Sequence, residues 1–126
     1  MLERGDQVPH FAVATIDGGR VDYRDIWQHT HLLLVTVGPA EPAGAGSYVA
    51  HLASQAPAVV SHDAACVITR DPIPGVPAPA IVVADRWGEI QIVIPRRASE
   101  GPDPAEILEW MSYVQSRCPE CEGEAR

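Results

Sequence analysis

Short apolar runs separated by polar segments predict several strands along the chain. Two apolar runs, Ala80–Ala84 and Ile90–Ile94, are rich in β-branched residues, and the segment between them, Asp85–Gly88, has the composition of a turn. This pattern predicts an antiparallel hairpin. Leu32–Val37 is apolar at almost every position, as expected for a central strand that is buried on both faces. Ala65–Thr69 is interpreted as a second central strand.

Apolar side chains recur at helical spacing in two other segments. The first, Ser47–Gln55, predicts a helix that Pro57 should end, because proline lacks the backbone N–H of a helix interior. The second begins at Asp103 or Pro104 and continues to Arg117. Aspartate is a favourable N-cap, and proline is favourable as the first helical residue.

The beginning of the chain has the pattern of a small hairpin. Val13 and Ile16 precede a turn at Asp17–Gly19, and Val21 then begins a short alternating segment. Tyr23–His29 is predicted to add one helical turn. Together with the later segments, this order predicts a mixed sheet in which the strands at 32–37 and 65–69 run parallel.

Composition and charge narrow the classes of function. The chain has 126 residues, which is enough for one domain, expected over residues 1–117 and followed by an acidic tail at 118–126. Its net charge of -8 argues against binding to nucleic acid or to an anionic membrane. No apolar run is long enough to span a bilayer, and the first residues are charged, so a cytoplasmic location is expected.

The tail contains Cys118 and Cys121 in a C-x-x-C arrangement, which can close a disulfide or share a metal. The pair follows the C-terminal end of the predicted helix, close to Glu120, Glu122 and Glu124. Both the helix dipole and these carboxylates raise the pKa of a thiol there. The pair provides only two of the four ligands of zinc, so a zinc site would need a partner chain or histidines. An incidental pair, a redox pair and a metal-linked dimer all remain open.

The remaining residues with reactive side chains have ordinary explanations. Cys66 lies within a predicted strand, and free cysteine is among the most frequently buried residue types. His29 and His31 have the spacing of a pair on one strand face, but no carboxylate or cysteine lies near them in sequence. Surface histidines are therefore the favoured interpretation, and no metal site is predicted there.

Four segments of the chain resemble the thioredoxin-like superfamily, and most closely its redoxin branch of thiol peroxidases and their relatives. Gly5–Phe11 is similar to the opening Gly-x-x-Ala/Val-Pro-x-Phe of redoxins, and Asp17–Val21 is similar to their Asp-Gly-x-x-Val hairpin. Leu32–Val37 is similar to their central strand. Pro79–Gly88 is similar to their cis-proline, strand and Asp-x-x-Gly turn. The resemblance implies an α/β thioredoxin-like fold, with a mixed central sheet, an N-terminal hairpin and helices on both faces. It also implies a cis peptide bond at Ala78–Pro79.

The resemblance does not extend to the catalytic residue of redoxins. In those proteins the loop after the central strand and the start of the next helix contain a reactive cysteine. The corresponding stretch here, Gly38–Gly44, has no cysteine, and Glu41 would oppose a thiolate electrostatically. The resemblance therefore implies a degenerate site.

Redoxin-like motifs without the reactive cysteine predict a non-catalytic module for protein binding or assembly. Pro39 and Glu41 on one side, with Ala78 and Pro79 on the other, would border a groove for an extended segment of a protein partner or of a second copy of the chain. The charge of -8 favours a basic or neutral partner. The alternative is a thiol-disulfide oxidoreductase or antioxidant protein that uses the cysteine pair of the tail. No cofactor is expected, apart from zinc if the tail cysteines bind it.

Overall fold

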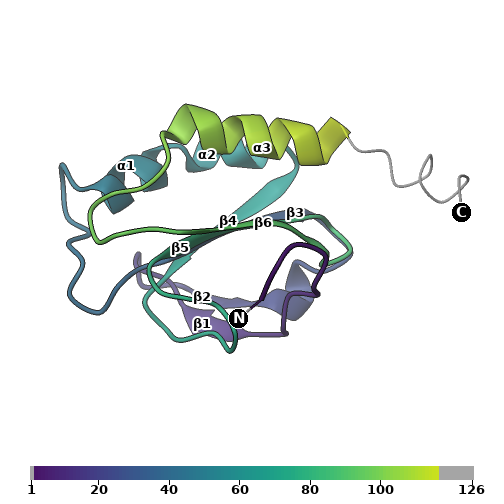
Figure 1. Cartoon of the computed structure of the whole chain (residues 1–126), viewed down its shortest axis with the longest axis horizontal. Helices are drawn as coiled ribbons and strands as arrows, with labels where there is room; N and C mark the ends of the chain where they lie inside the picture. Colours follow the sequence, from purple (N-terminus) through teal and green to yellow (C-terminus); the bar gives the residue numbers. More distant parts are fainter. Residues whose placement is uncertain (1, 117–126) are drawn as a thin grey trace, which may run out of the picture.

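The computed structural model describes residues 2–116 of the chain. Its centre is a four-stranded sheet in the order β4-β3-β5-β6 (Figure 1). The strands are β3 (His31–Thr36), β4 (Ala64–Thr69), β5 (Ala80–Ala84) and β6 (Ile90–Pro95). β3 is parallel to β4 and antiparallel to β5, and β5 is antiparallel to β6, so the predicted mixed sheet and hairpin are confirmed. β4 is an edge strand of this sheet, and the prediction of a central position for it is wrong.

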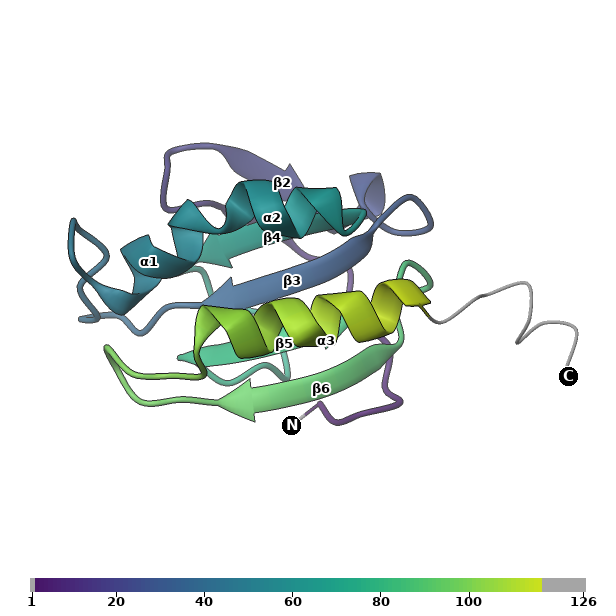
Figure 2. The ribbon, with the colours of Figure 1, turned by 90° about the horizontal axis from the view of Figure 1, so that it is seen from above.

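Three α-helices cover one face of the sheet: α1 (Tyr48–Ser54), α2 (Ala56–Ser61) and α3 (Pro104–Ser116) (Figure 2). The side chain of Ser47 caps α1 by accepting a hydrogen bond from the backbone N–H of Ala50, at 3.0 Å. Pro57 lies in the first turn of α2, where a missing N–H removes no hydrogen bond. The residue predicted to end a helix therefore lies at the start of the next one.

The opposite face of the sheet is covered by the N-terminal hairpin, which consists of β1 (Ala12–Ala14) and β2 (Arg20–Asp22). The single 3-10 turn η1 (Tyr23–Asp25) follows it. Within residues 2–116, η1 is the only helical element on this side, so the expected helices on both faces are present only in this limited form (Figure 1). Hairpin and turn fill the space because they supply large buried side chains, namely Phe11, Val13, Tyr23 and Ile26.

β3 separates two hydrophobic cores, which explains why it is apolar at nearly every position. Leu33 and Val35 point into the core beneath the helices, whereas Leu32 and Leu34 point into the core beneath the hairpin. All four side chains are almost completely buried. Alternation along the strand thus places one apolar residue on each face in turn.

The N-terminal segment connects both edges of the sheet. At the β6 edge, the backbone N–H of Gly5 donates to the carbonyl of Ile90, at 2.8 Å. At the β4 edge, the N–H of Ile16 donates to the carbonyl of Ile68, at 3.0 Å, and the hydroxyl of Thr69 donates to the carbonyl of Ala14.

Among residues 2–116, none of the helices combines the length and the apolar composition that a membrane span requires.

His31 begins β3 and is a buried titratable group, only 3% exposed, so its interpretation as a surface histidine is wrong. Its Nδ1 accepts a hydrogen bond from the backbone N–H of Arg86, at 3.0 Å, and the Arg86 guanidinium pairs with Asp63. Burial and then the charge of Arg86 hold the pKa of His31 below its ordinary value of 6.5, against the opposing effects of Asp63 and Asp85. The folded chain therefore favours the neutral imidazole.

This arrangement predicts that the free energy of unfolding decreases as the pH falls below 6.5. Because the pKa of His31 is lower in the folded state than in the unfolded state, the unfolded chain binds the proton first. The contribution of His31 to the free energy of unfolding is complete above its pKa in the unfolded chain. This contribution is lost as the pH falls towards its lower pKa in the folded chain. Urea unfolding at several pH values between 5 and 7.5 measures the effect.

The matched control for this experiment is His31→Asn, whose side-chain oxygen can still accept the hydrogen bond from Arg86 but does not titrate in this range. We expect this variant to show a weaker dependence on pH than the wild-type chain. An unchanged slope in the variant would show that another group causes the dependence.

Candidate functional site

The loop after β3 and the proline-rich segment before β5 lie side by side at one end of the sheet. The peptide bond between Ala78 and Pro79 is cis, the isomer that the resemblance implies. The Pro79 ring packs against Gly38, so that a Cβ atom built on Gly38 would lie 3.6 Å from the Pro79 Cδ. The hydroxyl of Thr36 also donates to the carbonyl of Pro77, at 2.6 Å.

The centre of this region is the carboxylate of Glu41, whose residue is only 2% exposed. Arg96 donates to both carboxylate oxygens, through Nη1 to Oε2 at 2.5 Å and through Nη2 to Oε1 at 2.9 Å. The backbone N–H of Ser99 donates to Oε2 at 2.9 Å, and that of Gly38 donates to Oε1 at 3.1 Å. The carboxylate is thus bound by four donors and forms a bidentate ion pair.

Arg96 connects this carboxylate with the ends of two strands. It follows β6 directly, and its Nη2 also donates to the carbonyl of Thr36, the last residue of β3, at 2.9 Å. The Arg96 guanidinium lies over the ring of Tyr48, with its Cζ 5.2 Å from the ring centroid. The Tyr48 hydroxyl donates to the carbonyl of Pro102, at 2.6 Å. The pair therefore also contacts the start of α1.

A second arginine fixes the backbone of the same loop. Arg70, which follows β4, donates through Nη1 to the carbonyl of Gly38 and through Nη2 to the carbonyl of Glu41, each at 2.6 Å. Two guanidinium groups from the ends of two different strands thus hold residues 38–41. The shape of the loop depends on these hydrogen bonds rather than on an apolar core.

The electrostatic state of Glu41 follows from these contacts. Burial alone would raise the pKa of the carboxyl, but the hydrogen bonds from Arg96, Ser99 and Gly38 and the charge of Arg96 outweigh burial and lower the pKa. The carboxylate is ionised and already accepts four hydrogen bonds. This geometry suits a structural anion better than a general base.

The four residues predicted to border a groove lie in this region but differ in exposure. Pro39 and Ala78 are exposed, and Pro79 is partly buried. Glu41 is buried, so its carboxylate faces inward to Arg96 rather than outward. The surface of the candidate site is therefore formed by proline and alanine, and the charged pair lies beneath it.

Sequence reasoning identified neither Arg96 nor Arg70. Glu41 and Arg96 are 55 positions apart, and no local pattern connects them. The only signal was indirect: each arginine follows an apolar strand at the end where the loop after β3 begins. Opposite charges at the same end of a sheet are candidates for pairing, but the sequence contains several such charges.

The cysteines predicted as catalytic, Cys118 and Cys121, lie outside the described residues, as do the domain boundary and the acidic tail. Cys66 is a free thiol on β4, partly buried against the core beneath the helices. Burial raises the pKa of this thiol to about 11. Among residues 2–116, no group of three or more His, Cys, Asp or Glu side chains has an arrangement suited to a metal ion.

The fold is shared with solved structures that include peroxiredoxins and the thioredoxin domain of a thiol-disulfide oxidoreductase. The chain superimposes on a reduced 2-Cys peroxiredoxin from Plasmodium vivax with a TM-score of 0.67 and 14% identity, over 90% of this chain and 97% of the other. It superimposes on AhpC from Mycobacterium tuberculosis with a TM-score of 0.68 and 12% identity, over 95% and 98% of the two chains. It superimposes on the thioredoxin domain of a thiol-disulfide oxidoreductase from Bacteroides vulgatus with a TM-score of 0.56 and 15% identity, over 90% of this chain and 99% of the other.

These likenesses show that the chain has a thioredoxin-like fold of the redoxin type, in agreement with the sequence motifs. At 12–15% identity they concern the fold alone. No model of a known protein family matches the sequence, and no curated protein matches it.

Removing one member of the Glu41–Arg96 pair should strongly destabilise the fold. Glu41→Gln leaves the buried guanidinium without its counter-ion, and Arg96→Met leaves the carboxylate unpaired. Each change should lower the free energy of unfolding by about 3 kcal/mol or more. Urea denaturation measures the loss, and Arg97→Met, at the exposed neighbouring arginine, is the matched control with little expected effect.

The double variant Glu41→Gln with Arg96→Met tests whether the loss in free energy of unfolding comes from an uncompensated buried charge. Its free energy of unfolding should decrease by less than the sum of the decreases in the two single variants, because no buried charge is left unpaired. A loss equal to that sum would show that the two side chains stabilise the protein independently.

The thiol of Cys66 should react slowly in the folded chain. With a pKa of about 11, only about one part in a thousand is thiolate at pH 8. In a Cys118→Ser, Cys121→Ser variant, alkylation by iodoacetamide should be at least tenfold slower in the native state than in urea. Mass spectrometry follows the reaction, and equal rates in both states would contradict the expected protection.

Proposed function

We propose that the chain is a redoxin-fold protein that binds a protein partner without thiol chemistry at the loop after β3. The observation that carries this proposal is the buried ion pair between Glu41 and Arg96. In the redoxins that the chain resembles, this loop and the following helix start contain a reactive cysteine. Here residues 37–47 contain no cysteine, and the loop is built around an internal carboxylate.

The chemistry of the arginines supports a role other than catalysis. A nucleophilic thiolate needs nearby positive charge that is not already neutralised. The guanidinium of Arg96 is paired with Glu41, and that of Arg70 donates to two loop carbonyls. The cationic groups at this end of the sheet thus stabilise the loop itself.

The exposed surface of the loop suits contact with a polypeptide. Pro39 and Ala78 are exposed and uncharged, and they lie on two segments that are packed together through Gly38 and Pro79. Because the arginines hold the loop in one shape, little conformational entropy would be lost when a partner binds. We infer an extended segment of a neutral or basic protein, or of a second copy of this chain, as the partner.

The first test compares the wild-type chain with a variant in which Cys66, Cys118 and Cys121 are all serine. Peroxide consumption with dithiothreitol and reduction of insulin disulfides are measured for both. We expect the wild-type rates to equal those of the cysteine-free variant. Activity that disappears with Cys118→Ser and Cys121→Ser alone would instead establish the oxidoreductase that uses the tail.

The second test addresses binding directly. A photo-crosslinking residue at Ala78 should capture a specific partner or a second copy, and capture should persist in the cysteine-free variant. The same residue at Val60, an exposed position on α2, is the matched control. Equal capture at both positions, or loss of capture without cysteines, would contradict the proposal.

A further inference from the structure

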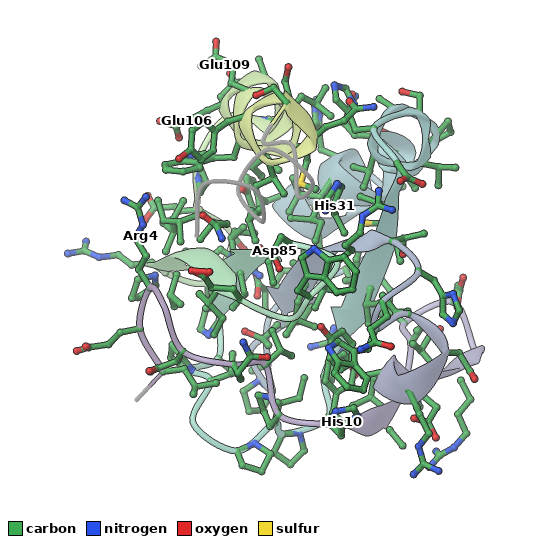
Figure 3. The ribbon with its side chains drawn as sticks, turned by 90° about the vertical axis from the view of Figure 1, so that its right-hand side faces the viewer. Arg4, His10, His31, Asp85, Glu106 and Glu109 are labelled. Atoms are coloured by element: carbon green, nitrogen blue, oxygen red, sulfur yellow. The ribbon has the colours of Figure 1, made fainter. Side chains whose placement is uncertain are left out.

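A hollow of about 370 Å³ lies between α3 and the N-terminal segment, away from the loop after β3. Its lining consists of Arg4, Glu106, Glu109, Trp110 and Tyr113. Figure 3 shows that Arg4, Glu106 and Glu109 project on the same side of the molecule. The proposed binding role of the loop after β3 makes no use of this hollow.

The hollow has the chemistry of a site for a cationic group. Glu106 and Glu109 are three positions apart on α3, as are Trp110 and Tyr113, so each pair shares one side of the helix. The two rings meet edge to face, with centroids 5.7 Å apart. Aromatic faces attract guanidinium and ammonium groups, and carboxylates neutralise them. A positively charged side chain therefore fits this combination better than an anion or a neutral group.

The two carboxylates do not have a counter-ion within the part of the chain that the structure describes. Neither Glu106 nor Glu109 forms an ion pair with a residue between 2 and 116, although Arg4 lines the same hollow. An incoming cation would enter a region of negative charge on a chain whose net charge is -8.

A second hollow, of about 330 Å³, adjoins the first because both are lined by Arg4 and Trp110. Its other lining residues are Leu2, Glu3, Gln91, Ile92, Val93 and Pro95. Three of these are apolar residues of β6 that are not fully buried. The two hollows thus form one groove beside β6, with an acidic, aromatic half and an apolar half.

We propose that this groove binds an extended segment of a basic partner protein. An arginine or lysine would occupy the half lined by Glu106, Glu109 and Trp110, and a nearby aliphatic side chain would occupy the half lined by β6. The chemistry of the groove selects this occupant over a second copy of the chain. A second copy would bring the same acidic helix and a further charge of -8 to the interface, so that like charges would oppose each other.

The probe for the test is the blocked peptide acetyl-Val-Arg-Val-Arg-Val-amide, added to the full-length chain. Amide and indole N–H signals are followed by NMR, with Trp27 and Trp87, which do not line the groove, as internal references. We expect a saturable shift of the Trp110 indole signal. The same peptide with citrulline in place of arginine keeps the shape without the charge, and it should bind at least fivefold more weakly.

Three variants locate the interaction. Glu106→Gln with Glu109→Gln should weaken binding of the arginine peptide roughly fivefold, as expected for two exposed ion pairs. Asp25→Asn with Glu89→Gln changes the net charge by the same amount outside the groove and should have a much smaller effect. Trp110→Leu keeps an apolar helix former but removes the aromatic face, and binding should weaken again.

Three outcomes would overturn the proposal. Equal loss in both double variants would show only a general attraction between opposite charges. Equal affinity for the citrulline peptide would show an apolar groove without preference for cations. A shift of the Trp110 signal with chain concentration alone, together with a dimer in sedimentation equilibrium, would identify a second copy as the occupant. None of these outcomes depends on cysteines or on Ala78, so the proposal about the loop after β3 is tested separately.

Discussion

The buried ion pair between Glu41 and Arg96 is the interaction on which the end of the fold around the loop after β3 depends. It joins the loop after β3 to the end of β6, and through the Thr36 carbonyl it reaches β3 as well. Two charges removed from water are stabilised by the hydrogen bonds that their polar atoms make. The carboxylate accepts four hydrogen bonds, whereas the buried Arg96 Nε has no partner among residues 2–116, so the carboxylate side of the pair holds the loop in its shape.

The fold of this chain can be compared with known structures separately from the polar network around Glu41 and Arg96. The sheet, the helices and the N-terminal hairpin match those of peroxiredoxins, although only 12–14% of residues are identical. In this chain, one end of the sheet holds a buried polar network around the Glu41 carboxylate. Arg70 and Arg96 serve this network. A fold alone does not determine function, because function depends on the site built on it.

Much of the fold was predictable from sequence because it depends on local patterns. Uninterrupted apolar character identified β3, and a turn between β-branched runs identified the hairpin of β5 and β6. The role of Pro57 was misjudged, since a proline favours the first turn of a helix as strongly as it disfavours the interior. The partnership of Glu41 with Arg96 was not predictable, because it exists only after strands far apart in sequence have been assembled.

The N-terminal segment has a consequence for how the chain acquires its structure during synthesis. Its partners at the β6 edge, Ile90 for Gly5 and Gly88 for Val8, are made 80 or more residues later. The backbone groups of residues 5–8 must therefore wait for this later hairpin before they are paired. Until then, Val8 lacks the part of its core that β5 and β6 provide, and such transiently exposed apolar surface favours aggregation of unfinished chains.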